Sequence, residues 1–148
     1  MEHQELKILI DRYTSATNEV NRRITQRMNE QVHQQLTTDQ FSTLHYMYKH
    51  QPCTSSDISH EFSIGKSAVT AQINRLFERG FIRRNRDNED RRIVYLSLTN
   101  EGKELMEHAI SKLYDVLGDI LTQFDQEEVE SFIQKLEKLV QILKDNGN

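Results

Sequence analysis

The stretch RRNRDNEDRR, residues 83–92, holds five arginines and three acids in ten positions. An arginine guanidinium is a planar fork of donors that fits phosphate oxygens and the edges of bases. Because Asp90 and Arg92 lie on the same side of an extended segment, the carboxylate can hold that guanidinium in one rotamer. These residues predict an anion-binding surface, and the narrow minor groove of DNA is a partner that attracts arginine. The alternative is a solubilising hairpin whose charges pair with one another.

A second set of polar residues lies just before this stretch, in GKSAVTAQINRLF, residues 65–77, which contains no acid. Helical spacing puts Val69, Ile73, Leu76 and Phe77 on one side, which we expect to pack inward. The other side then carries short polar groups and an arginine, namely Ser67, Thr70, Ala71, Gln72, Asn74 and Arg75. Such a helix can enter the major groove of DNA, which is wide enough for one α-helix. The alternative is an ordinary amphipathic helix with a solvated polar face.

Two helices and a hairpin are predicted to position these residues. The cap-residue cluster TSSD, residues 54–57, starts a short helix, and the tight turn SIG, residues 63–65, separates it from the next one. Gly80 ends that second helix as a C-cap. The hydrophobic period then changes to two, which predicts short strands at 81–84 and 93–98 with the charged tip between them. This order is that of a helix-turn-helix followed by a two-stranded wing.

Longer amphipathic helices are predicted on both sides of this unit, at residues 5–30 and 100–144, and Thr37, Thr99 and Asp125 are predicted helix starts. The first of these helices has no obvious partner in the chain, so its apolar stripe would stay wet. We therefore expect a second copy of the chain to cover the stripes. The residues expected in this dimer interface are Leu6, Leu9, Tyr13, Leu121, Phe132, Leu136, Leu139 and Leu143. The alternative is that the stripes pack within one chain.

The composition of the 148 residues fits one folded, mostly helical domain, with 36% hydrophobic residues, one proline and five glycines. The net charge of -4 hides an asymmetry, because residues 65–96 carry eight basic and four acidic side chains. Binding to an anion depends on this local field and not on the total. No apolar run approaches a membrane span, the start of the sequence lacks a signal-peptide pattern, and Cys53 is the only cysteine. We therefore expect a cytoplasmic protein without a membrane partner or a disulfide framework.

Residues 54–102 resemble the multiple-antibiotic-resistance regulator (MarR) family of bacterial winged-helix repressors, and the flanking helices extend the resemblance over nearly the whole chain. The resemblance rests on GKSAVTAQINRLFERGFIRR followed by DNEDRRIVYLSLTNEG. It implies a mainly α (α+β) fold with a single domain over 1–148 and a winged helix-turn-helix DNA-binding lobe at 36–98. The recognition helix would span about 66–79 and the wing about 81–98, with dimerisation helices at 5–30 and 100–144. The expected function is that of a homodimeric transcription regulator on a pseudo-palindromic operator.

The resemblance also implies roles for individual residues. The residues expected to contact the major groove are Ser67, Thr70, Ala71, Gln72 and Arg75. Ser55 and Lys66 would contact phosphates. Arg84 and Arg86 would bind DNA as part of the wing, and Arg92, oriented by Asp90, would enter the minor groove. Family members often place an arginine or another polar residue at position 71, so Ala71 leaves the operator sequence open. The resemblance further implies a repressor that is released by a small ligand or by another signal, and we expect a ligand to be a small aromatic or phenolic molecule. The expected pocket residues are Tyr13, Phe41, Leu44 and Tyr48, and the alternative is that they are core.

Other classes of function find less support in the sequence. The six histidines show no metal-ligand spacing, although His45 or His108 could contribute to a zinc site, and no metal or cofactor is predicted. Oxidant-sensing relatives usually place their cysteine near the N-terminus, whereas Cys53 lies beside Pro52. The chain has no glycine-rich phosphate loop and no nucleophile elbow, so we do not expect an enzyme. The alternatives that remain are a protein-interaction module whose wing binds an acidic partner, and a metal- or redox-responsive sensor.

Overall fold

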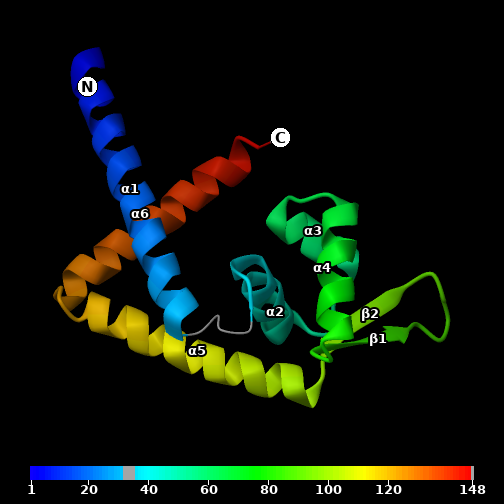
Figure 1. Cartoon of the computed structure of the whole chain (residues 1–148). Coiled ribbons are helices and arrows are strands. Elements are labelled where there is room, and N and C mark those ends of the chain that lie inside the picture. The colour runs from blue at the N-terminus through cyan, green and yellow to red at the C-terminus, as the bar shows by residue number, and fades with distance from the viewer. Residues whose placement is uncertain (32–35, 148) are drawn as a thin grey trace. The chain divides into compact units, whose positions relative to one another are not determined.

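The computed structural model describes residues 1–31 and 36–147. In chain order its elements are α1 (His3–Gln31), α2 (Thr38–His50), α3 (Ser55–Phe62), α4 (Lys66–Glu78), β1 (Ile82–Arg86), β2 (Val94–Leu98), α5 (Asn100–Leu121) and α6 (Gln126–Asp145). The chain divides into two units, Met1–Leu113 and Tyr114–Asn148. The predicted mainly α fold with one small two-stranded sheet is confirmed (Figure 1).

Capping residues explain where several helices begin. Thr37, Thr54 and Asp125 each form a capping box, which has two hydrogen bonds. The side chain of the cap residue accepts from the backbone N–H of the residue three positions later, and the side chain of that later residue accepts from the backbone N–H of the cap residue. Thr99 caps α5 by the first of these two bonds alone: its side chain accepts from Gly102 N at 3.1 Å, and glycine has no side chain to return the bond. The helix starts predicted from these residue types are confirmed, because caps are set by neighbours in the sequence.

The turn between α3 and α4 has the tight geometry that the sequence predicted. Ser63 adopts the left-handed conformation with φ 51°, and its N–H donates to His60 O. The Ser59 hydroxyl donates to Ile64 O at 2.6 Å and closes the turn from the other side. The two helices therefore form a helix-turn-helix, in which α4 holds the position of the recognition helix (Figure 1).

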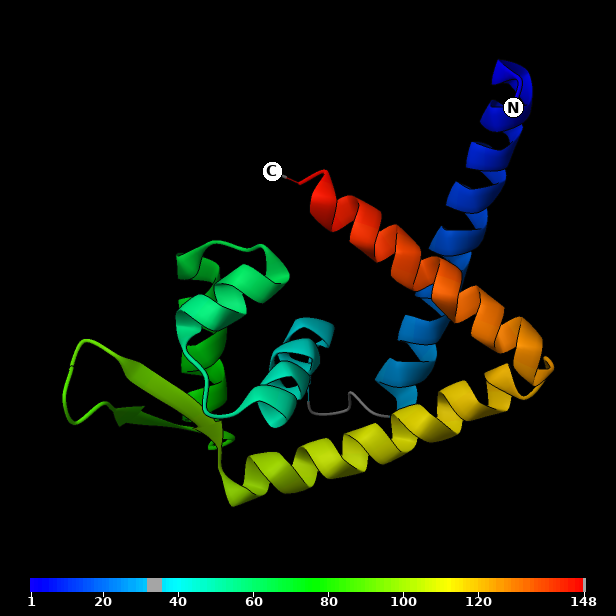
Figure 2. The same cartoon turned by 180° about the vertical axis from the view of Figure 1, so that it is seen from behind.

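A hairpin follows α4 directly. Gly80, with φ 79°, ends α4, and the bonds Gly80 N to Phe77 O and Phe81 N to Leu76 O turn the chain into β1. Strands β1 and β2 pair antiparallel from Ile82–Leu98 to Arg86–Val94. This hairpin, which we call the wing, extends from the C-terminal end of α4 (Figure 1 and Figure 2).

The core of the first unit holds the helix-turn-helix and the wing together. Its completely buried side chains include Leu44, Met47, Ile58, Val69, Leu76 and Met106. A smaller cluster of Met28 and Ala109 joins α1 to α5, and Phe41 of α2 packs against both clusters. The prediction that Phe77 packs inward was wrong: its side chain is 44% exposed, because the other three apolar residues already fill the inward stripe of α4.

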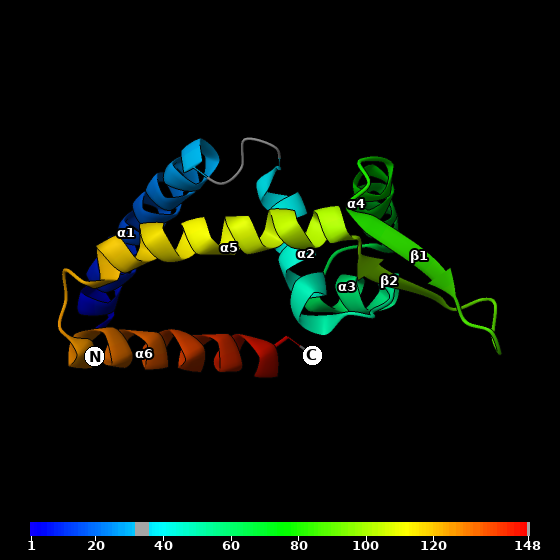
Figure 3. The same cartoon turned by 90° about the horizontal axis from the view of Figure 1, so that it is seen from below.

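The start of α5 is fixed against the base of the wing. Thr99 N donates to Phe81 O at 3.1 Å, and the Thr99 hydroxyl donates to Gly80 O at 2.6 Å. A side chain at Gly102 would place its Cβ only 2.1 Å from Phe81 O, so glycine is required there for this close approach. From this junction α5 continues as one helix into the second unit (Figure 3).

The second unit consists of the end of α5 and α6. Large apolar side chains of α6 are exposed, among them Phe132, Ile133, Leu136, Val140, Ile142 and Leu143. Within the part of the chain that the structure describes, the helices are too short or too polar to cross a membrane.

Candidate nucleic-acid interface

The outward side of α4 presents the residues that the sequence predicted. Val69, Ile73 and Leu76 are buried, whereas Lys66, Ser67, Thr70, Ala71, Asn74 and Arg75 are exposed. The Thr70 hydroxyl donates to Lys66 O at 2.9 Å, so it keeps its acceptor capacity for a partner. This surface is free of acids up to Glu78, and it can approach a polyanion without repulsion.

Gln72 does not belong to this exposed side, although the sequence predicted that it would. It is half-buried, and its Oε1 accepts a hydrogen bond from the hydroxyl of the buried Thr43 at 2.7 Å. A second bond, Arg79 Nη1 to Gln40 Oε1 at 3.2 Å, joins the same two helices at the end of α4. Gln72 thus fixes α4 to α2. The Thr43–Gln72 hydrogen bond joins residues 29 positions apart, so the local spacing of residues could not predict it.

The wing meets α4 at a hollow of about 400 Å³. The hollow is lined by three apolar residues, Ile73, Val94 and Leu96, and by the polar residues Ser55, Thr70, Asn74, Arg84 and Arg86. The structure therefore brings together four residues that were assigned separately from the sequence, namely Ser55, Thr70, Arg84 and Arg86. It adds Asn74, which the resemblance did not assign.

Arg84 connects the wing to α4. Its guanidinium lies over the ring of Phe77, 4.4 Å from the centroid, and donates a hydrogen bond to Asn74 Oδ1. A guanidinium over an aromatic face is attracted by the ring quadrupole. The exposed Phe77 therefore has a function on the surface, since it holds a wing arginine beside the recognition helix.

The tip of the wing is ordered by its own side chains. Asp87 Oδ1 accepts from Glu89 N at 2.9 Å, and Asp90 Oδ1 accepts from Arg92 N at 3.0 Å. Arg86 Nη1 donates to Arg91 O at 2.9 Å and ties the strand to the far side of the loop. The acids and Arg86 thus support the loop, and they leave other arginines free to face solvent.

Arg92 is held in the orientation that the sequence suggested. Its Nε and Nη2 donate to the two carboxylate oxygens of Asp90, each at 3.0 Å. The bidentate hydrogen bonding from Arg92 lowers the pKa of Asp90, which stays ionised, and it raises the pKa of the guanidinium. The Arg92 side chain nevertheless remains 91% exposed, so its outer donors can reach a phosphate or a groove. Contact with DNA itself stays a prediction.

Cys53 has the environment of an inert thiol. Its side chain is buried, and its backbone pairs with Leu96 of β2 through bonds of 3.1 and 2.6 Å. Burial, with a smaller contribution from the charge of Asp57, raises the pKa of the thiol to about 11. A reactive cysteine needs a lowered pKa and access to solvent, so this geometry disfavours an oxidant-sensing role.

The described residues contain no group of three or more His, Cys, Asp or Glu side chains that could hold a metal ion. His45 is half-buried and stacks on Phe41, with ring centroids 5.8 Å apart. Burial lowers the pKa of His45, and the charge of Lys49 lowers it further. His33 lies outside the described residues.

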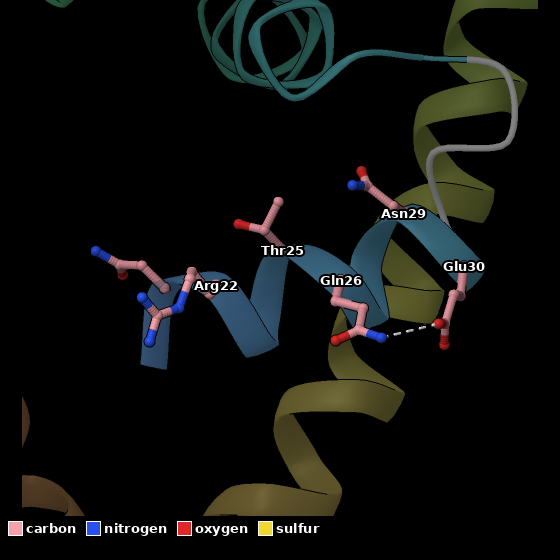
Figure 4. Close-up of a pocket in the computed structure, with 6 residues that line it drawn as sticks. Arg22, Thr25, Gln26, Asn29 and Glu30 are labelled. Carbon is pink, nitrogen blue, oxygen red and sulfur yellow. Dashed lines mark hydrogen bonds between the residues drawn. The ribbon is translucent and has the colours of Figure 1, made fainter. Parts of the chain in front are cut away.

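The residues expected to form a ligand pocket have different surroundings. Leu44 is completely buried in the core, Tyr13 is exposed on α1, and the role of both in a pocket stays a prediction. Phe41 and Tyr48 are half-buried against the core, and Tyr48 Oη donates to Glu107 Oε1 at 3.5 Å. A separate hollow on α1 is lined by the polar residues Asn21, Arg22, Thr25, Gln26, Asn29 and Glu30 (Figure 4). These residues all come from one helix, and none was predicted to bind a ligand.

Comparison with known proteins identifies relatives of this architecture. The family model described as MarR family matches residues 36–94. A Bacillus subtilis (strain 168) protein described as an uncharacterized HTH-type transcriptional regulator, YwhA, is 34% identical over 66% of this chain and 70% of its own.

Solved structures give the same result for the fold. A complex of MepR from Staphylococcus aureus with DNA matches with a TM-score of 0.79 at 25% identity, over 88% of this chain and 98% of the other. Streptococcus pneumoniae FabT in complex with DNA matches with a TM-score of 0.80 at 24% identity, over 95% and 98%.

Proposed function

Because the chain belongs to the MarR family of DNA-binding transcriptional regulators, we propose that it is a homodimeric repressor of a pseudo-palindromic operator. We further propose that a small aromatic or phenolic ligand releases it. The regulator would work in the cytoplasm, where a bacterial chromosome lies.

The observation that carries the homodimer is the exposed apolar surface of α1 and α6. On α1 the side chains of Leu6, Leu9 and Tyr13 are 43–55% exposed, and on α6 those of Phe132, Leu136 and Leu143 are 43–64% exposed. Leu121 and Leu139 are half-buried. Soluble single chains rarely leave such continuous apolar stripes in water. A second copy with the same stripes covers them in a symmetric, self-complementary interface.

Two copies supply two reading heads, and this supports the palindromic operator. One helix-turn-helix makes few base contacts and binds DNA largely through phosphates. A dimer with two-fold symmetry reads two half-sites about one helical turn apart, which is about ten base pairs. The acid-free face of α4 and the wing residues Arg84, Arg86 and Arg92 would then contact each half-site from both grooves.

Release by a ligand is supported by the place of Phe41. This side chain packs against both core clusters of the first unit, one in the helix-turn-helix and one between α1 and α5. A ligand could bind more tightly to a conformation in which these two clusters have moved relative to each other. It would then favour a state in which the spacing of the two DNA-binding heads no longer matches the operator.

Selection from a random pool of DNA duplexes tests this function. The wild-type protein should enrich a palindrome whose half-sites are about ten base pairs apart. Leu136→Lys, on the exposed stripe, is the informative variant, because it leaves α4 and the wing unchanged. We expect it to enrich only single half-sites or nothing. An enriched wild-type motif without two-fold symmetry would refute the dimeric operator.

A further inference from the structure

We propose that Asn74 determines operator specificity by presenting only its amide donors to the major groove, and that Arg84 of the wing positions it to do so. This inference rests on the proposed sequence-specific operator binding. It assigns the contacted base to those that offer major-groove acceptors without a neighbouring amino donor, which are guanine and thymine.

Asn74 lies where a base-reading side chain must lie. It is exposed on α4, on the helical face opposite the buried Val69, Ile73 and Leu76. It also lines the hollow between α4 and the wing. The other carboxamide of α4, Gln72, is half-buried and tied to Thr43. Asn74 is therefore the carboxamide of the recognition helix that is free to meet a base edge.

The orientation of the Asn74 carboxamide is fixed from the wing side. Arg84 Nη2 donates to Asn74 Oδ1, so the oxygen points toward the wing and the amide nitrogen points away from it. Arg84 cannot swing aside freely, because its guanidinium rests on the ring of Phe77. Its backbone is fixed too, since Arg84 pairs with Leu96 in the sheet. The three side chains Phe77, Arg84 and Asn74 form one clamp between helix and wing.

The chemistry of the carboxamide turns this orientation into a preference among bases. An asparagine reads adenine by bidentate bonding, which needs its oxygen and its nitrogen on the same base edge. With the oxygen held by Arg84, only the two amide hydrogens face outward. Guanine offers O6 and N7 as acceptors in the major groove and thymine offers O4. Adenine offers one acceptor, N7, beside an amino donor that would face the second amide hydrogen, and the amino group of cytosine is a donor. The clamp should therefore favour guanine or thymine at one position in each half-site.

The clamp is tested by comparing the base preferences of four proteins in the same duplex selection, namely the wild type, Asn74→Asp, Arg84→Lys and the control Arg83→Lys. Arg83 is the matched control because it neighbours Arg84 and donates instead to Leu98 O at 3.3 Å. In the wild type, guanine or thymine should exceed adenine by about tenfold at the contacted position. Asn74→Asp replaces the donors with an acceptor, so the preference there should reverse toward adenine or cytosine.

Arg84→Lys keeps the positive charge but loses the planar fork and the stacking on Phe77. The Asn74 carboxamide can then rotate, and adenine should rise to within about twofold of guanine or thymine at that position. Other positions and the salt dependence of binding should stay as in the wild type. Arg83→Lys should leave all preferences unchanged. Thermal unfolding of each variant checks that the fold is intact.

The outcomes separate this inference from the proposed function. If the wild type enriches no motif, the operator proposal fails and the clamp fails with it. If the wild type enriches a palindrome but Asn74→Asp changes no single position, the clamp alone is refuted. It is also refuted if Arg84→Lys weakens every sequence equally, because Arg84 would then act only through its charge.

Discussion

Replacement of Gly102 by alanine is expected to destabilise the protein, although the same change usually stabilises a helix. Alanine in place of glycine in a helix contributes up to about 1 kcal/mol of stability. At Gly102 the new Cβ would lie 2.1 Å from Phe81 O, and side-chain carbons essentially never approach closer than 3.0 Å. The first turn of α5 must therefore move away from the base of the wing by about 0.9 Å.

That movement disturbs two hydrogen bonds of the junction, Thr99 N to Phe81 O and Gly102 N to the Thr99 hydroxyl, both 3.1 Å long. A buried hydrogen bond contributes about 1 kcal/mol, and loss of a helix cap costs about 1 kcal/mol. Overpacking adds about 1–3 kcal/mol. Even after the helical gain, Gly102→Ala should lower the free energy of unfolding by about 2–4 kcal/mol.

Urea unfolding followed by circular dichroism measures this change, at one fixed protein concentration because association contributes to stability. Gly118→Ala is the matched control, because Gly118 lies in the same helix and nothing is within 4 Å of the added Cβ. The control should be stabilised by up to about 1 kcal/mol. Equal or greater stability of Gly102→Ala relative to the wild type would refute the close junction between α5 and the wing.

Three further predictions concern the interface and the thiol. Arg92→Ala should weaken operator binding by about tenfold to a hundredfold in fluorescence anisotropy, and unchanged affinity would remove the wing tip from the interface. Leu136→Lys should shift the protein to single chains in sedimentation experiments, since it puts a charge on the exposed stripe of α6, and a persistent dimer would place the interface elsewhere. Cys53 should react slowly with a thiol reagent at pH 7 and quickly in urea, because its pKa is raised to about 11; a fast reaction in the folded protein would contradict its burial.

Local signals predicted the elements of the fold well. The caps at Thr37, Thr54 and Asp125 depend on bonds to residues three positions away, so the sequence contains everything that determines them. The change of hydrophobic period after Gly80 likewise marked the wing. The bidentate contact of Asp90 and Arg92 was also predictable, because these residues are two positions apart.

Residues whose partners are distant in the sequence were harder to assign. Helical spacing suggested that Phe77 packs inward and that Gln72 faces outward, whereas Phe77 is exposed and Gln72 is half-buried. Position 72 lies on the flank of α4 that Thr43 reaches, and the ring of Phe77 is covered by Arg84 from the next element. The expected pocket residues show a different limit: core and pocket residues follow the same helical period, so spacing alone cannot separate them.

The central claim is that two chains joined through α1 and α6 place two winged helix-turn-helix heads on one DNA duplex. Native mass spectrometry of the wild-type protein with its selected operator duplex tests this claim directly. The account predicts a complex of two chains per duplex, with no complex of one chain at concentrations where half of the duplex is bound. A stable complex of one chain per duplex, formed with the same affinity, would contradict it.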